Sequence, residues 1–198
     1  MQPDREGGRS WPICCRVTLT LVNALAHARA ACLHCGLYAG GVYNTPLAHF
    51  ISWRTYGTWL HGDPRGSVDR RNNRFGTPLL PASENLDSWE SSELKHPPVE
   101  LDDRMRDVVT QSIRHVCEHR SWRLLALNVR TNHVHTVVAA NETPERVLNT
   151  FKSWATRRLV EASLIDRGSR VWSRHGSTIY LFRPEKVAEK VDYVLNGQ

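Results

Sequence analysis

The sequence contains no apolar run long enough to cross a membrane, since a transmembrane helix needs about 20 predominantly apolar residues. It is also poor in cysteine outside its beginning, because four of the five cysteines lie within the first 35 residues and only Cys117 follows them. Cys32 and Cys35 have the spacing of a zinc knuckle or redox pair, but no second pair follows. These absences argue against a membrane protein or membrane partner and against a disulfide scaffold.

Residues 1–47 differ in character from the remainder of the chain. They lack sustained periodicity, and Asp4 and Glu6 are their only acidic residues. Residues 16–28 resemble a signal peptide, but their apolar run is short and contains Asn23. The two acidic residues also differ from the positively charged N-terminal region of a signal peptide. We interpret 1–47 as an N-terminal extension, either disordered or a product of a misassigned start codon, and 48–198 as one domain in the cytoplasm. Secretion is the alternative.

Length and charge narrow the class of protein further. A chain of 198 residues is long enough for one well-packed core but short for two. The formal net charge of +6 and the pI near 9.3 favour an acidic partner, and nucleic acid is the commonest one for a basic protein. A bland basic surface is the alternative that charge alone leaves open.

From residue 48 onward, strand patterns alternate with helix patterns. The predicted elements are a strand at 49–60, a helix at 102–117, strands at 123–129 and 133–140, a helix at 144–159, a strand at 177–182 and a helix from 184 onward. This order predicts an α+β fold, a ferredoxin-like split βαβ antiparallel sheet with helices on one side and one added C-terminal helix. The polar stretch 61–100 offers little core material and is expected to be a functional or disordered loop.

Two histidines share one face of the strand predicted at 133–140. Because side chains alternate along a strand, His133 and His135 point the same way, and two adjacent imidazoles can bind one divalent metal. A structural pair is the alternative, since the chain has ten histidines and so short a motif recurs by chance. His115 and His119 are also spaced for a shared metal, but their basic neighbours favour a solvated helix face.

The last predicted helix carries a tyrosine away from its apolar side. Its apolar residues, which fall within a narrow arc at 100° per residue, are Val187, Val191, Val194 and Leu195. Tyr193 points about 150° from the centre of that arc, beside Lys186 and Lys190. Ammonium groups stabilise a phenolate, so this placement suits a phenol that attacks a phosphate. An exposed tyrosine without chemistry is the alternative.

Several basic residues are candidates for contacts with DNA phosphates. Arg158 falls inside an apolar helical stripe and must reach water, a carboxylate or a phosphate, whereas Lys152 and Arg157 lie off that stripe. The candidates include Arg65, Arg70, Lys152, Arg157, Arg158, Lys186 and Lys190, with Arg71 and Arg74 in the same basic loop as Arg70. For each of them a solvated side chain is the alternative.

Three motifs in the same order resemble those of the single-tyrosine transposases of the histidine-hydrophobic-histidine (HUH) superfamily, and among them the REP-associated tyrosine transposases. Residues 53–63, WRTYGTWLHGD, are similar to a WTTYGTWLPGD-like opening. Residues 128–135, NVRTNHVH, match a histidine hairpin, and residues 193–198, YVLNGQ, match a YVxxGQ-like ending. The resemblance covers roughly 48–198.

The resemblance implies an activity and a set of site residues. It implies that His133 and His135 hold Mg²⁺ or Mn²⁺ with a third polar ligand, Gln198 or else Asn196, and that Tyr193 attacks the scissile phosphate. The expected product is a 5′-phosphotyrosine with a free 3′-OH, which can rejoin a new end without a nucleotide cofactor. The implied partner is single-stranded DNA folded into hairpins. A homodimer is compatible with the sequence but is not specified by it.

Two other classes of function fit part of the pattern. A non-catalytic nucleic-acid-binding regulator of ferredoxin-like fold, derived from a transposase, would need no tyrosine nucleophile, although the aromatic RNA-binding signature is missing from these strands. A metal-dependent nuclease that uses water would also tolerate Tyr193→Phe. A structural protein is the weakest alternative, because nothing in the sequence is repetitive or coiled.

Overall fold

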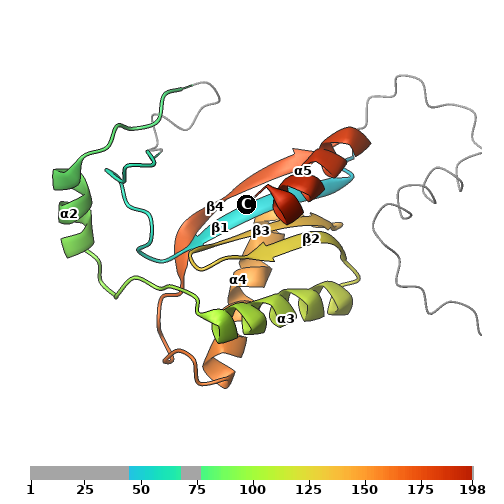
Figure 1. The fold of residues 1–198 in the computed structure, drawn as a ribbon. Coiled ribbons are helices and arrows are strands. Elements are labelled where there is room, and N and C mark those ends of the chain that lie inside the picture. Colours follow the sequence, from blue (N-terminus) through green and yellow to red (C-terminus); the bar gives the residue numbers. More distant parts are fainter. Residues whose placement is uncertain (1–44, 68–76, 198) are drawn as a thin grey trace, which may run out of the picture. The chain divides into compact units, whose positions relative to one another are not determined.

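The computed structural model describes residues 45–67 and 77–197. They form a four-stranded sheet, three helices packed on it, and one helix outside it (Figure 1). The elements are β1 (Ala48–Thr55), α2 (Glu84–Ser92), α3 (Asp103–His119), β2 (Arg123–Val129), β3 (His133–Ala139), α4 (Pro144–Glu161), β4 (Trp172–Leu181) and α5 (Pro184–Asn196).

The sheet has the strand order β2-β3-β1-β4, and all neighbouring strands are antiparallel. This order, with α3 between β1 and β2 and α4 between β3 and β4, is the split βαβ topology. The predicted α+β ferredoxin-like fold is therefore confirmed. The register of the two central strands places Ser52 opposite His135 and Arg54 opposite His133.

The main core lies between the sheet and the pair of helices α3 and α4. It contains Ile51 and Trp53 from β1, Ile113 from α3 and Phe151 from α4, each at most 2% exposed. The start of α3 is fixed as predicted, because the Asp102 carboxylate accepts a hydrogen bond of 2.7 Å from the Met105 amide. The face of the sheet that packs on α3 and α4 is thus occupied by the hydrophobic core.

The opposite face of the sheet carries α5 (Figure 1). Val194 is buried there with Phe50 and Val137, and the partly buried Val187 and Val191 pack on the same cluster. The added C-terminal helix predicted from the sequence is confirmed. Leu195 is a correction to the predicted apolar side, since it is 45% exposed: the apolar contact of α5 is narrower than the helical period suggests.

Helix α2 was not expected within the polar stretch 61–100. Ser83 caps it by accepting from the Leu86 amide, and none of its residues is buried. It contacts the segment after β1 through Glu90, whose carboxylate accepts from the amide of His61 at 2.8 Å. The loop prediction was therefore wrong for this part, because a capped polar helix leaves no apolar period to detect.

Among the described residues, none of the helices combines the length and the apolar composition that spanning a membrane requires.

Candidate active site

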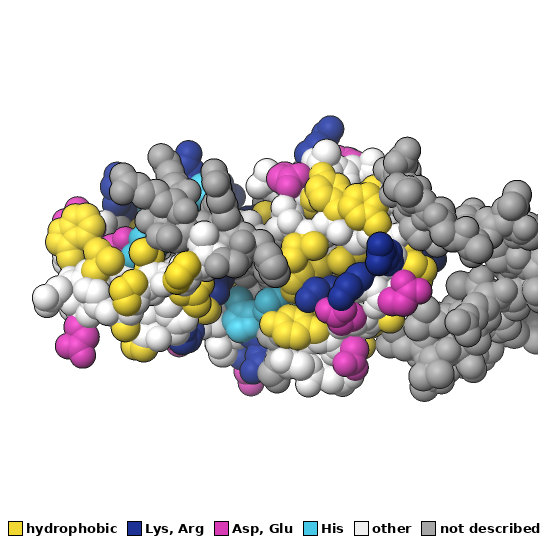
Figure 2. Space-filling model, turned by 90° about the horizontal axis from the view of Figure 1, so that it is seen from above, with side chains coloured by type: hydrophobic (Ala, Val, Ile, Leu, Met, Phe, Trp, Pro, Cys, Tyr) yellow, Lys and Arg dark blue, Asp and Glu magenta, His cyan; other side chains and the backbone are white. Residues whose placement is uncertain are grey.

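The two histidines of β3 lie on the face of the sheet that carries α5. Their ring centroids are 4.8 Å apart, and both side chains are half-buried. Viewed toward this face, histidine side chains reach the surface beside hydrophobic side chains and Lys or Arg (Figure 2). Both imidazoles therefore lie together on one side of β3, as the alternation of side chains along a strand predicts.

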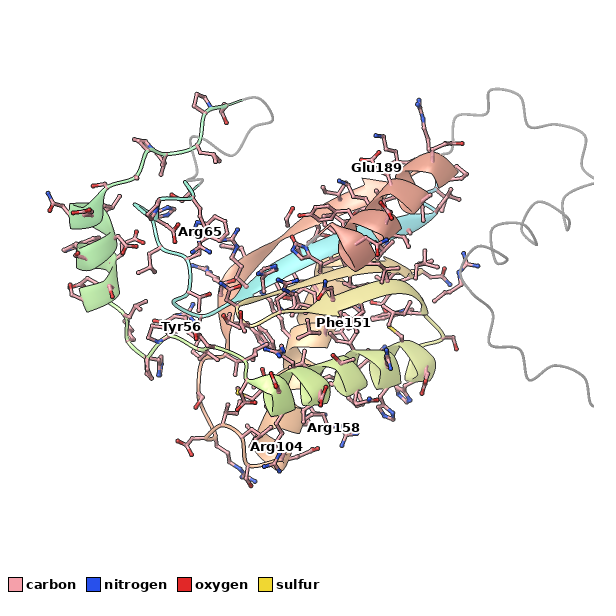
Figure 3. The ribbon with its side chains drawn as sticks, in the orientation of Figure 1. Tyr56, Arg65, Arg104, Phe151, Arg158 and Glu189 are labelled. Atoms are coloured by element: carbon pink, nitrogen blue, oxygen red, sulfur yellow. The ribbon has the colours of Figure 1, made fainter. Side chains whose placement is uncertain are left out.

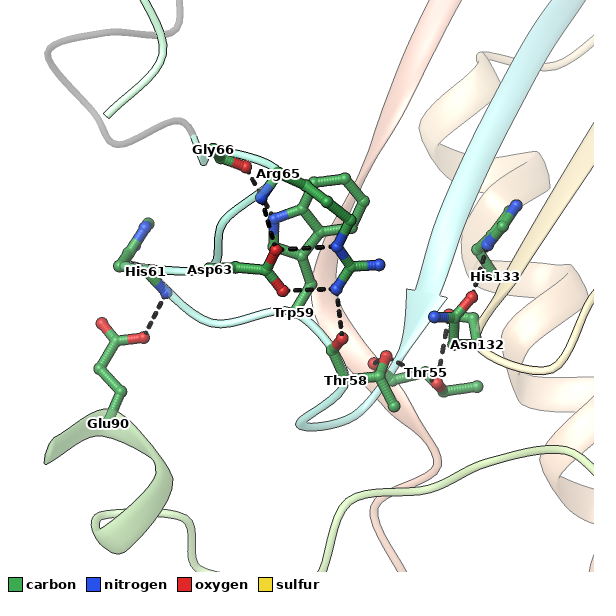
Figure 4. Close-up of polar contacts among 10 residues, drawn as sticks. All are labelled: Thr55, Thr58, Trp59, His61, Asp63, Arg65, Gly66, Glu90, Asn132 and His133. Carbon is green, nitrogen blue, oxygen red and sulfur yellow. Dashed lines mark hydrogen bonds and ion pairs between the residues drawn. The ribbon is translucent and has the colours of Figure 1, made fainter. Parts of the chain in front are cut away.

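His133 is oriented by the turn that precedes β3. Its Nδ1 lies 2.6 Å from Oδ1 of Asn132, and because an amide oxygen only accepts, Nδ1 is the protonated nitrogen in this arrangement. Asn132 is itself fixed, since its backbone carbonyl accepts from the amide and the hydroxyl of Thr55 at 3.0 and 3.2 Å (Figure 4). In this tautomer the lone pair of His133 is on Nε2, the arrangement that a metal ligand needs.

His135 is held in its neutral form. Burial, followed by the charges of His133 and Arg54, lowers the pKa of His135 to about 4. Its Nδ1 is buried and has no hydrogen-bond partner among the described residues. A neutral imidazole with an unsatisfied buried nitrogen costs stability, and a bound cation is one way in which such a cost is offset. The histidine pair therefore fits a divalent metal.

The ring of Tyr193 meets the ring of His135 edge to face. Their centroids are 5.8 Å apart at an interplanar angle of 81°, and the same tyrosine lies 6.0 Å from Phe50. Tyr193 is 40% exposed, but because Phe50 belongs to the apolar cluster beneath α5, the Tyr193 ring lies at the edge of that cluster and not on the far side of the helix. The tail of the chain and the histidine pair thus share one side of the molecule, as the predicted chemistry requires.

The two lysines predicted beside Tyr193 behave differently. The ammonium of Lys190 lies 5.4 Å from the centroid of the Tyr193 ring, whereas Lys186 forms an ion pair of 2.6 Å with Glu189. Glu189 also lies 3.8 Å from Lys190, so part of the positive charge near the phenol is compensated.

A hydrogen bond from the sheet fixes the end of α5. The side-chain amide of Asn128, on β2, donates to the backbone carbonyl of Val194 at 3.0 Å. Asn128 lies opposite His135 in the β2–β3 register, so the same point of the sheet positions an imidazole and the turn of helix that carries Tyr193. Sequence reasoning missed this role, although Asn128 lies inside the hairpin motif.

The third predicted ligand is not placed. Gln198 lies outside the described residues, and α5 ends at Asn196 with Gly197 as its C-cap, as use of Gln198 requires. The amide of Asn196 donates to Asp192 at 2.8 Å. Within 45–67 and 77–197 no three His, Cys, Asp or Glu side chains cluster in a way that could hold a metal. The donors that the described residues bring together are the two imidazoles of His133 and His135.

The predicted DNA-contacting cations of α4 lie on the opposite face of the sheet. Arg157 and Arg158 are exposed there, and Arg158 forms an ion pair of 2.9 Å with Glu161. Figure 3 shows Arg158 and the α5 residue Glu189 on opposite sides of the sheet. Water, a carboxylate or a phosphate was expected as the partner of Arg158, and the partner in the structure is the carboxylate of Glu161.

Lys152 corrects the expectation of a solvated or phosphate-binding side chain. It is only 8% exposed, and its ammonium donates to the carbonyls of Ser173 and His175 at 2.9 and 3.1 Å. Burial lowers the pKa of Lys152 to about 8. Its physical role is to tie α4 to β4, because the aliphatic stem fills the core edge while the head bonds backbone carbonyls.

The segment after β1 contains the remaining predicted cations. Arg70 lies outside the described residues. Arg65 donates to both oxygens of Asp63, at 2.8 and 2.5 Å, and to the carbonyl of Thr58 at 3.3 Å (Figure 4). This hydrogen bonding holds the pKa of Asp63 down at about 2, and much of the positive charge of Arg65 is compensated.

Sequence reasoning also missed a cation beside the histidines. Arg54 is opposite His133 across the strands, and its guanidinium lies over the ring of Trp59. Alternation along β1 would have placed Arg54 on the same face as Phe50, but the pairing of β1 with β3 is needed to bring it to His133.

Comparison with known protein families relates part of the chain to transposases. Residues 98–177 match the family model described as "Transposase IS200 like", a segment that includes the histidine hairpin and ends before Tyr193. No curated protein matches the chain in sequence.

Two solved structures are similar to the chain. A candidate transposase from Deinococcus radiodurans R1 has 17% identity and a TM-score of 0.44, covering 81% of this chain and 97% of its own. A REP-associated tyrosine transposase bound to a REP hairpin has 13% identity and a TM-score of 0.42, covering 80% and 70%. Residues 98–177, which include the histidine hairpin, are thus similar to the IS200-like transposases.

Proposed function

We propose that this protein cleaves and rejoins single-stranded DNA through a covalent bond to Tyr193, as a single-tyrosine transposase. The observation that carries the proposal is the contact between the Tyr193 and His135 rings, 5.8 Å between centroids, on the face of the sheet that is not occupied by α3 and α4. The nucleophile and the metal-binding pair must act on the same phosphate group, and this placement allows it.

The chemistry is a transfer of a phosphodiester bond. The phenolic oxygen of Tyr193 attacks the phosphorus, an O–P bond forms, and the bond to the 3′ oxygen of the leaving strand breaks. The phenolic proton is lost and the 3′ oxygen gains one, which leaves a 5′-phosphotyrosine and a free 3′-OH. The bond energy is conserved in the intermediate, so the reverse reaction can join a new 3′ end without a nucleotide cofactor.

His133 and His135 are the residues that would hold the divalent cation, with Gln198 or Asn196 as the proposed third ligand. When bound, Mg²⁺ or Mn²⁺ would neutralise negative charge that develops on the phosphoryl oxygens. Two imidazoles without a carboxylate suit Mn²⁺ better, because Mg²⁺ strongly prefers oxygen ligands. Asn132 orients His133, and the ammonium of Lys190 lies 5.4 Å from the centroid of the Tyr193 ring.

The test is a denaturing gel of 3′-labelled single-stranded hairpin DNA after incubation with the protein and Mn²⁺. We expect a labelled band of protein size with the wild-type chain and none with Tyr193→Phe. Tyr180→Phe is the matched control, since Tyr180 is also an exposed tyrosine, at 43%, but lies on β4. Cleavage that survives Tyr193→Phe would indicate a water-dependent nuclease, and DNA binding without cleavage would indicate a regulator.

A further inference from the structure

The side chain of Arg54 lies beside the histidine pair. Arg54 and His133 are directly opposite in the antiparallel register of β1 and β3, and side chains so placed have Cβ atoms about 4.5–5.5 Å apart on the same face. The charge of Arg54 is among the causes that lower the pKa of His135, after burial and His133. Arg54 is therefore a component of the site and not a distant surface charge.

The ring of Trp59 supports the guanidinium of Arg54. Arg54 lies over this ring, and the indole is fixed because its Nε1 donates to the carbonyl of Gly66 at 2.9 Å. Arg65 also lies over Trp59, 4.2 Å from the ring centroid. A guanidinium stacked on a fixed aromatic ring loses little further freedom when it binds an anion.

The two arginines at Trp59 differ in their partners. Arg65 is paired with Asp63 through two hydrogen bonds. The guanidinium of Arg54 has no ion pair and no hydrogen bond with any of the residues that the structure describes, and burial followed by the charge of Arg65 lowers the pKa of Arg54 to about 10. Asp63, which pairs with Arg65, offsets only part of this effect, and a half-buried guanidinium without a direct ion pair is unfavourable, so this position favours an incoming anion.

We propose that Arg54 binds a backbone phosphate of the single-stranded DNA beside the histidine pair, with Trp59 holding the guanidinium in place. The inference rests on the proposed function, because it names DNA as the anion. A free phosphate ion could bind the same guanidinium, but the neighbouring histidine pair and Tyr193 are the residues proposed to cleave a phosphodiester, which favours DNA as the source of the phosphate. Arg54 then positions the strand at the point where Tyr193 acts.

The test measures DNA binding without cleavage. Fluorescence anisotropy of a labelled single-stranded hairpin oligonucleotide, in EDTA, gives the binding constant over a range of salt concentrations. Each phosphate contact to single-stranded DNA contributes about 0.7 to the slope of log K against log salt. We expect Arg54→Gln to reduce the slope by about 0.7 and to weaken binding about tenfold at low salt.

Arg157→Gln is the matched control. Arg157 also lies over a tryptophan, 5.6 Å from the Trp154 ring, and its replacement removes the same charge, but α4 is on the opposite face of the sheet. We expect this variant to keep the wild-type slope. Arg54→Lys, which retains the charge and loses the planar fork, is expected to keep the slope and bind more weakly; circular dichroism verifies that each variant is folded.

The outcomes separate this inference from the proposed function. Equal slopes for wild type and Arg54→Gln, in a protein that still forms the Tyr193 adduct, would overturn the Arg54 contact alone. Equal losses in Arg54→Gln and Arg157→Gln would also overturn it, since general charge would then explain binding. An Arg54-dependent slope without any adduct would support the contact and refute cleavage, and a wild-type chain that does not bind the DNA would refute both.

Discussion

The side-chain amide of Asn128 donates a hydrogen bond to the carbonyl of Val194, the residue that follows Tyr193, at 3.0 Å. Because Asn128 also lies opposite His135, one residue of β2 links the helix that carries the nucleophile to the strand that carries the proposed metal ligands. Tyr193 is 40% exposed and contacts the sheet through the rings of His135 and Phe50, and we expect this hydrogen bond to hold the helix in the position that those contacts need.

Replacing Asn128 with alanine is therefore expected to slow the covalent reaction more than it destabilises the fold. Loss of one hydrogen bond costs about 1 kcal/mol of unfolding free energy, whereas misplacing a nucleophile lowers rates by about tenfold or more. The measurements are the rate of adduct formation and urea unfolding. Asn149→Ala, at an exposed site on α4, should change neither. An unchanged adduct rate in Asn128→Ala would show that α5 is positioned by its apolar contact alone.

Removal of the metal should abolish the adduct. We expect EDTA to eliminate the labelled protein band and Mn²⁺ to restore it in wild type but not in His135→Ala. Calorimetric titration with Mn²⁺ should show affinity lowered at least about tenfold in that variant. His119→Ala is the control, since His119 is exposed on α3. Adduct formation that persists in EDTA would contradict a role for a cation.

Lys152 should make stability depend on pH in the alkaline range. Burial lowers its pKa from 10.5 to about 8 in the folded protein. Between these values the unfolded chain binds more protons than the folded chain, so the free energy of unfolding rises with pH through this window. In Lys152→Met the free energy of unfolding should rise less steeply with pH, by up to about 1 kcal/mol per pH unit. Urea unfolding across the window tests this, and identical pH profiles would contradict it.

Cys117 should be inert while the protein is folded. It is 3% exposed, and burial raises the pKa of its thiol to about 12, so the reactive thiolate is scarce at about pH 8. Iodoacetamide is expected to leave Cys117 unmodified in the native protein and to modify it in urea. Peptide mass spectrometry distinguishes Cys117 from the four N-terminal cysteines, and equal labelling under both conditions would disprove its burial.

The fold and the paired histidines were predictable because they depend on local periodicity. Alternation placed His133 and His135 on one face, and the order of strands and helices restricted the topology to the observed sheet. Helical period kept Tyr193 out of the apolar stripe of α5, and its side chain is 40% exposed, although its ring also meets Phe50 at the edge of the apolar cluster. Each of these inferences needs only residues that are close in sequence.

The missed features depend on contacts between distant segments. Arg54 reaches His133 only through strand pairing, and Lys152 is buried only because β4 presents carbonyls at Ser173 and His175. A helical period that places Lys152 off the apolar stripe cannot reveal that another strand covers it. For α2, the signal was a capping serine, Ser83, followed by Glu84, which predicts a helix start even without an apolar stripe.

The most direct test of the account is identification of the residue that becomes linked to DNA. After reaction with a single-stranded hairpin oligonucleotide and Mn²⁺, nuclease trimming and proteolysis leave a short nucleotide on one peptide, which mass spectrometry can sequence. The account predicts a 5′-phosphate bonded to the phenolic oxygen of Tyr193. A modification at any other residue, or cleaved DNA with a free 5′-phosphate and no modified peptide, would contradict it.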